Sequence, residues 1–125
     1  MLRAEGKTMN KPTIYAIDFD GTIVENCFPV IGKLKPEAER FIRELRSRGD
    51  KWLLYTMREG ESLQLAMDFL AIHDLLPDAA NENLPEMCAL YKNDPRKIFA
   101  HVYIDDHNAG GLRFAWATAD QQCNK

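Results

Sequence analysis

The chain has 125 residues, of which 46% are hydrophobic and 28% are charged. This length suits one compact domain, and the composition excludes a disordered chain, a collagen-like repeat and a disulfide-stabilised miniprotein. The formal net charge of −3 excludes a strongly cationic surface. It therefore disfavours nucleic acid and anionic lipid as partners, although it does not exclude local basic patches.

The sequence also predicts where the protein resides. No apolar run approaches the ~20 residues that a membrane helix needs, and the N-terminal residues lack the apolar stretch of a secretory signal. The cysteines are odd in number, widely spaced and without a C-x-x-C pair: Cys27, Cys88 and Cys123. We therefore expect reduced thiols in a cytoplasmic protein that makes no membrane contact, with no disulfide framework and no zinc site.

The N-terminal part of the chain predicts a short lead followed by a strand. Residues 1–12 are polar and are expected to be flexible, and residues 13–125 are expected to form one domain. The β-branched and aromatic run over 13–19 predicts a buried strand that stops at the turn signal Asp20-Gly21. Residues 21–35 then predict a loop or a small flap.

The next stretch predicts a helix and a second strand. Pro36 suits the first turn of a helix, and Gly49 is suited to end it. Between them, apolar residues follow the i, i+3, i+4, i+7 pattern of one buried stripe: Ala38, Phe41, Ile42 and Leu45. A second strand is predicted over 51–56, with a connecting loop over 57–60.

The remaining elements complete an alternating pattern. A second helix is predicted over 61–73 and a weak third strand near 78–80. Residues 81–95 predict a loop with at most one helical turn, and 101–105 predict the last strand. Strands that alternate with helices predict an α/β domain, namely a three-layer Rossmann-like fold with a mostly parallel sheet.

Polar residues stand where three of these strands end: Asp18, Asp20, Thr56, Asp105 and Asp106. In a parallel sheet the binding crevice lies at the carboxyl ends of the strands, so we expect these side chains to meet. Crowded carboxylates raise each other's pKa, and a hard divalent cation such as Mg²⁺ removes that conflict. One aspartate is then free to attack phosphorus and a second to act as general acid and base. None of the three histidines has the spacing of a metal site.

These residues resemble the haloacid dehalogenase-like (HAD) phosphohydrolases. The resemblance rests on D-F-D-G-T-I-V at Asp18–Val24, then Thr56, Lys97 and I-D-D at Ile104–Asp106, and these elements span most of the chain. It implies an Mg²⁺-dependent phosphatase that hydrolyses phosphomonoesters through an aspartyl-phosphate. Predicted elements fill the intervals between the motifs, so the chain resembles the small capless bacterial members. An open site suits large or partly macromolecular phosphoesters, and the expected partner is a phosphorylated small molecule or a larger phosphoester.

The resemblance also implies roles for single residues. Asp18 is then the nucleophile and a metal ligand. Asp20 is the general acid and base, with its backbone carbonyl on the metal. Thr56 hydrogen-bonds the transferring phosphoryl group. Lys97 pairs with that group and with Asp18, and Lys92 is the alternative lysine.

The last strand and the loop after Thr56 contribute the remaining candidates. The resemblance implies that Asp106 is the more direct Mg²⁺ ligand and that Asp105 supports it, although the two roles are open to exchange. Arg58 is a candidate contact to a substrate phosphate or carboxylate. A surface ion pair between Arg58 and Glu59 or Glu61 fits the sequence equally well.

Two further classes of function remain open from the sequence. One is a receiver-like signalling module, which carries similar residues but has its acidic pair after the first strand, an order that this chain reverses. The other is a relative that binds phosphate and Mg²⁺ without turnover. The sequence names neither the substrate nor the oligomeric state.

Overall fold

The computed structural model describes residues 11–92, 97–108, 111 and 116. Four parallel strands form one sheet in the order β3-β2-β1-β4. The strands are β1 (Ile14–Ile17), β2 (Lys51–Leu54), β3 (Ala79–Ala80) and β4 (Val102–Ile104). The central strand β1 is buried along its whole length, as expected for a parallel sheet covered on both faces.

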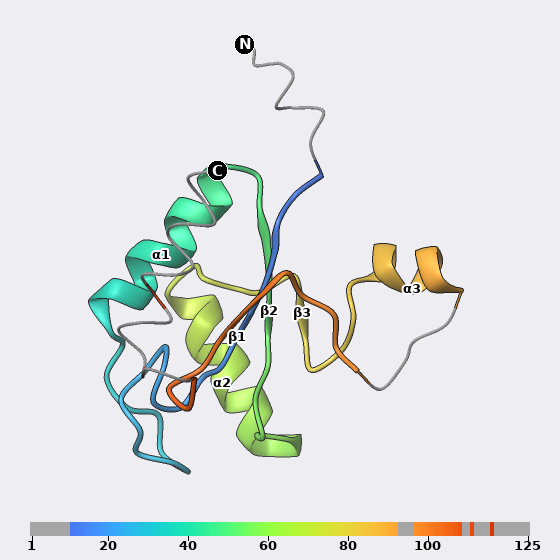
Figure 1. Cartoon of the computed structure of the whole chain (residues 1–125). Helices are drawn as coiled ribbons and strands as arrows, with labels where there is room; N and C mark the ends of the chain where they lie inside the picture. Colours follow the sequence, from blue (N-terminus) through green and yellow to red (C-terminus); the bar gives the residue numbers. More distant parts are fainter. Residues whose placement is uncertain (1–10, 93–96, 109–110, 112–115, 117–125) are drawn as a thin grey trace.

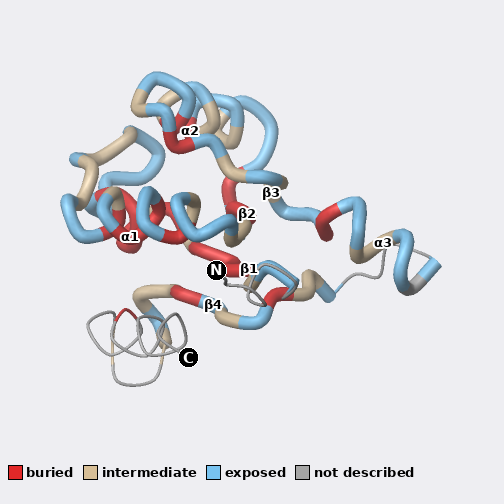
Figure 2. The backbone as a smooth tube through the Cα atoms, turned by 90° about the horizontal axis from the view of Figure 1, so that it is seen from above, coloured by how far each residue is buried: buried red, intermediate tan, exposed pale blue. Residues whose placement is uncertain are grey.

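Three helices connect the strands: α1 (Pro36–Ser47), α2 (Gly60–Ile72) and α3 (Pro85–Tyr91). The helices α1 and α2 lie together on one side of the sheet, and α3 lies apart from them (Figure 1, Figure 2). This is the α/β architecture that the alternating sequence pattern predicts, and the three-layer Rossmann-like prediction is confirmed.

Side chains of β1 divide between two apolar clusters because successive residues of a strand point to opposite faces. Tyr15 and Ile17 pack in the larger cluster with the buried residues of α1 and α2. Ile14 and Ala16 pack in the smaller cluster with residues near α3, including Leu84. The sheet therefore has a core on each face, and its carboxyl edge is left for polar residues.

The apolar stripe of α1 is confirmed, since its four predicted positions are all buried. Gly49 follows the helix with φ +85°, a conformation that glycine adopts without strain. Among the described residues, none of the helices has the length and apolar character that crossing a membrane requires.

The prediction of a loop with at most one helical turn over 81–95 is wrong at α3, a helix of seven residues. Pro85 stands in its first turn, and Leu84 and Met87 pack against the sheet, so tertiary burial stabilises a helix that is too short to form alone. Residues 1–10 of the predicted lead lie outside the described part of the chain.

The connections reverse direction at one point in the sheet. The chain runs from β1 to β2 and β3 on one side, and then crosses to β4 on the other side of β1. Open parallel sheets bind ligands outside the carboxyl ends of the strands at such a switch point. Asp18 follows β1 and Asp105 follows β4, so both aspartates stand at the predicted position.

Candidate functional site

Asp18 occupies the position directly after β1. Its backbone N–H donates to the carbonyl of Ile104 at 2.9 Å, which extends the β1–β4 pairing by one residue and sets Asp18 beside Asp105. Its Oδ2 accepts a hydrogen bond of 3.1 Å from the hydroxyl of Thr22. Thr22 is fully buried, and its Oγ1 accepts the backbone N–H of Asp106 at 3.0 Å. Thr22 therefore joins the first motif to the last.

The electrostatic environment of Asp18 opposes its ionisation. Burial, followed by repulsion from Asp105, raises the pKa of the Asp18 carboxyl to about 7, and Asp106 adds to the effect. The hydrogen bond from Thr22 works in the opposite direction but is too weak to cancel it. A cation at this point would favour the ionised carboxylate.

Gly21 allows the two motifs to approach closely. Its φ is +89°, and a Cβ added there would stand 2.4 Å from Oδ2 of Asp106. A larger residue would therefore strain the turn and displace the Asp106 carboxylate. The glycine of D-x-D-G-T therefore has a structural role, because it leaves space for the Asp106 carboxylate in the loop after β4.

The loop after β4 gathers three potential ligand groups. Single ligand atoms of Asp105, Asp106 and His107 all lie within 4.8 Å of one another. The Nδ1 of His107 is 3.3 Å from Oδ1 of each aspartate, and the His107 side chain is 90% exposed. The spacing of the histidines did not indicate His107, whereas its position directly after the Asp105-Asp106 pair was a signal that could have found it.

The pKa values of Asp105 and Asp106 are shifted in opposite directions. Burial would raise the pKa of Asp105, but hydrogen bonds from the backbone N–H of His107, from Asp106 and from the His107 ring outweigh it and hold that pKa below its usual value. Burial and the hydrogen bond shared with Asp105 raise the pKa of Asp106. Within the described part of the chain, Oδ1 of Asp106 is buried and makes no hydrogen bond, although Nδ1 of His107 lies 3.3 Å from it. A buried carboxylate oxygen without a hydrogen bond, among clustered carboxylates, fits a hard divalent cation.

Asp20 does not join this cluster through its side chain. Its carboxylate is bound by Arg58 in a bidentate pair, with Nε to Oδ2 and Nη2 to Oδ1 both at 2.8 Å. The side chain of Arg58 is 1% exposed and that of Asp20 is 16% exposed. A shielded, bidentate pair of this kind holds both oxygens of Asp20 in a fixed orientation.

The other N–H groups of Arg58 bind backbone carbonyls. They reach Ser62 at 3.1 Å, and Pro29 and Val30 at 3.3 Å each. With the two bonds to Asp20, the five donors of the guanidinium all have partners. The group also lies over the rings of Phe19 and Phe28, with its carbon 5.2 and 5.0 Å from their centroids.

Arg58 corrects the predicted ion pair with Glu59 or Glu61, because its partners are Asp20 and three backbone carbonyls. A contact between Arg58 and a substrate stays a prediction, and it would require the guanidinium to give up one of these bonds. The sequence showed only the charges next to Arg58, whereas its true partner is 38 positions away. Arg58 ties the flap to the loop after β2 and to the start of α2.

Thr56 lies just beyond β2, in a loop that Asn81 fastens. The backbone N–H of Thr56 donates to Oδ1 of Asn81 at 2.8 Å, and Nδ2 of Asn81 donates to the carbonyl of Arg58 at 3.3 Å. The Oγ1 of Thr56 accepts the backbone N–H of Arg58 at 3.1 Å. Within the described residues the hydroxyl of Thr56 donates no hydrogen bond, and its contact with a phosphoryl group stays a prediction.

The predicted lysine has no fixed partner. Lys97 is exposed, and Lys92 follows α3 in the left-handed conformation at φ +61°. Among the described residues, neither side chain makes a hydrogen bond or an ion pair with Asp18. Which lysine pairs with a phosphate therefore stays a prediction.

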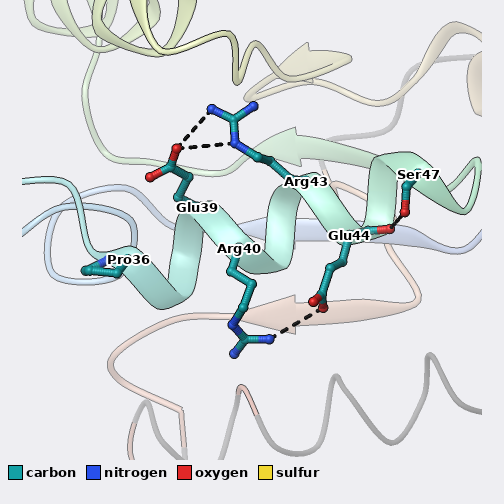
Figure 3. A pocket seen from close by; sticks show the side chains of 6 residues that line it. All are labelled: Pro36, Glu39, Arg40, Arg43, Glu44 and Ser47. Carbon is teal, nitrogen blue, oxygen red and sulfur yellow. Dashed lines mark hydrogen bonds and ion pairs between the residues drawn. The ribbon is translucent and has the colours of Figure 1, made fainter.

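A hollow elsewhere on the surface does not coincide with these groups. It follows the outer face of α1, where Arg43 pairs with Glu39 at 2.9 Å and Arg40 with Glu44 at 3.5 Å (Figure 3). These side chains neutralise one another in pairs spaced four residues apart, as exposed helix faces commonly do. The site is therefore identified by the carboxylates at the switch point.

Comparison with known proteins relates the whole chain to one solved structure. No family model and no curated protein matches the chain. A conserved protein from Bacteroides thetaiotaomicron is 32% identical, with a TM-score of 0.76, over 90% of this chain and 93% of that one. The chain belongs to the same family as this Bacteroides protein. The family shares the α/β fold described above, and the description of that protein names no activity.

Proposed function

We propose that the protein is a capless, HAD-type, Mg²⁺-dependent phosphatase that hydrolyses phosphomonoesters through a covalent phosphate on Asp18. The observation that carries the proposal is the meeting of Asp18, Asp105 and Asp106 at the switch point of the sheet. The order of the motifs, D-x-D-G-T, Thr, Lys and D-D, supports the same assignment.

The metal would be held mainly by Asp18 and Asp106, with Asp105 in support and the backbone carbonyl of Asp20 as a further ligand. The buried Oδ1 of Asp106 and the carboxylate repulsion at Asp18 support this set. When bound, Mg²⁺ supplies positive charge that neutralises the phosphoryl oxygens and keeps the carboxylates ionised.

The chain's own residues account for the chemical steps. Thr22 holds one oxygen of Asp18 and so orients the carboxylate. An oxygen of Asp18 forms a bond to phosphorus while the bond from phosphorus to the ester oxygen breaks, and the departing oxygen takes a proton. Water then attacks phosphorus, gives up a proton, and releases phosphate with the Asp18 carboxylate restored.

Asp20 is the proton donor and acceptor in this proposal. Because both of its oxygens are bound to Arg58, Asp20 has to exchange an arginine N–H for the ester oxygen in order to act. Thr56 and Lys97 would bind the oxygens of the phosphoryl group, with a hydroxyl proton and a positive charge respectively. We propose a cytoplasmic location for this activity, which the odd number and wide spacing of the cysteines support.

The test is hydrolysis of para-nitrophenyl phosphate by the purified full chain with Mg²⁺. Asp18→Asn should abolish turnover, and Asp68→Asn, at an exposed position of α2, is the matched control and should leave it unchanged. Mass spectrometry after an acid quench should find phosphate on Asp18. Full activity of Asp18→Asn would refute the assignment of the nucleophile.

The bidentate pair between Arg58 and Asp20 favours a second candidate function, a module that binds phosphate and Mg²⁺ without hydrolysis. A receiver-like signalling module is one form of this candidate. An aspartate held on both oxygens is poorly placed to transfer protons. Mg²⁺ binding with no turnover across a broad phosphoester panel would favour this candidate. A long-lived phosphorylated form after treatment with acetyl phosphate would single out the receiver-like version.

A further inference from the structure

Two exposed tyrosines stand beside the carboxylates, and the phosphate chemistry above does not use them. Tyr55 is the first residue after β2 and Tyr103 is the middle residue of β4, and their side chains are 44% and 38% exposed. Their ring centroids are 6.1 Å apart, with an angle of 62° between the ring planes. We call this pair the tyrosine shelf.

The sheet explains why two rings from non-adjacent strands meet. In the parallel register Ala16 of β1 pairs with Tyr103 and with Leu53, and Tyr55 is two positions after Leu53. Side chains alternate along strands, so Tyr55, Tyr103 and Ala16 point to the same face. Ala16 is fully buried, and its small side chain leaves room on this face for the two rings to approach each other.

The shelf is partly fixed in place. The hydroxyl of Tyr103 donates to the carbonyl of Ile98 at 2.6 Å and accepts the backbone N–H of Ala100 at 3.1 Å. The hydroxyl of Tyr55 has no hydrogen-bond partner in the part of the chain that the structure describes. Because its hydroxyl is held, the Tyr103 ring loses little conformational entropy when a ligand binds beside it. The Tyr55 hydroxyl is able to hydrogen-bond a heteroatom of the ligand's ring.

The same register sets the shelf next to the carboxylates. Asp18 is two positions after Ala16, and Asp105 is two positions after Tyr103, so both share the face of the shelf. Two residues along a strand span about 6.6 Å. The backbone N–H of Tyr55 donates to the carbonyl of Ile17 at 3.0 Å, so Tyr55 stands beside Asp18 at the carboxyl edge of the sheet. A phosphate at Asp18 would therefore bring the group on its ester oxygen toward the Tyr55 ring.

We propose that the tyrosine shelf binds a flat aromatic or heteroaromatic ring that the substrate carries close to its phosphate. This inference rests on the proposed phosphatase activity and narrows it to one class of phosphomonoester. The exposed Tyr55 ring supplies the contact surface, with the Tyr103 ring meeting it at an angle of 62°, and the nearby carboxylates fix where the phosphate lies.

Binding of inert phosphonates with Mg²⁺ present tests the shelf without turnover. Wild-type protein should bind benzylphosphonate more tightly than methylphosphonate or cyclohexylmethylphosphonate. Tyr55→Ala should weaken benzylphosphonate binding about fivefold and leave methylphosphonate binding unchanged, since ring contacts of this kind are modest. Leu65→Ala, which truncates an exposed apolar residue of α2, is the control and should change neither.

The outcomes that overturn the shelf are specific. Equal affinity for the benzyl and cyclohexylmethyl compounds would show that flatness is not recognised. Equal weakening of benzyl and methyl compounds in Tyr55→Ala would show a general structural effect. Unchanged benzylphosphonate binding in that variant would show that Tyr55 makes no contact.

Hydrolysis separates this inference from the phosphatase proposal. If benzyl phosphate is hydrolysed and Tyr55→Ala lowers kcat/KM for it more than for cyclohexylmethyl phosphate, both proposals are supported. If para-nitrophenyl phosphate and both of these esters are left intact but benzylphosphonate binding depends on Tyr55, the phosphatase proposal fails and ring recognition stands for a site that binds phosphate without turnover. If both are hydrolysed with a ratio unaffected by Tyr55→Ala, the shelf fails and the phosphatase stands.

Discussion

Replacing Arg58 by methionine should destabilise the protein strongly. Methionine is a long apolar side chain that leaves the Asp20 carboxylate without its partner and three backbone carbonyls without their donor. Breaking a buried ion pair from one side costs about 3–5 kcal/mol, and the partial exposure of Asp20 sets the expected loss near 3 kcal/mol. Because the whole fold is stable by only about 5–15 kcal/mol, this loss is a large fraction of the total.

Urea unfolding followed by tryptophan fluorescence measures this loss, since Trp52 and Trp116 are both buried. Arg40→Met is the matched control: its ion pair with Glu44 is exposed, and its loss should cost less than about 0.5 kcal/mol. The double variant Asp20→Asn, Arg58→Met should lose less free energy of unfolding than the two single variants lose together. A loss below about 1 kcal/mol for Arg58→Met would refute the reasoning.

Three further predictions concern the carboxylate cluster. Burial and the neighbouring carboxylates raise the pKa of Asp18 to about 7, so the free energy of unfolding should fall as the pH rises from about 4 to about 7. Urea titrations should show this fall, and Asp18→Asn should reduce it to the part that the raised pKa of Asp106 contributes. In calorimetry, Mg²⁺ should raise the melting temperature more at pH 8 than at pH 5, because protons compete with Mg²⁺ for the carboxylates at low pH. Asp106→Asn should lose most of this increase. Gly21→Ala should cost about 1–3 kcal/mol in urea unfolding and weaken Mg²⁺ binding, whereas Gly60→Ala, where an added Cβ meets no atom, should leave Mg²⁺ binding intact.

The sequence was most informative where structure depends on local periodicity. The apolar stripe of α1 and the run of β1 follow from spacing alone, and the structure has both. The gathering of Asp18 and Asp105 was also predictable, because the ends of parallel strands share one edge of the sheet. α3 was missed because its stability comes from burial of its neighbours against the sheet and not from its own pattern.

The partner of Arg58 was beyond the reach of the sequence. Arg58 and Asp20 are far apart along the chain, and only the folded flap brings Pro29 and Val30 around the guanidinium. The tyrosine shelf has the same origin, since it depends on the register of three strands. Such contacts are fixed by tertiary geometry, which no local signal encodes.

The five bonds of Arg58 have a consequence for access to the site. They fasten the flap to the loop after β2 and to the start of α2, so moving the flap would break several hydrogen bonds at once. Because Asp20 belongs to the same network, a ligand that took the place of Arg58 on Asp20 would also loosen the flap. Ligand binding at Asp20 and the position of the flap are therefore expected to be coupled.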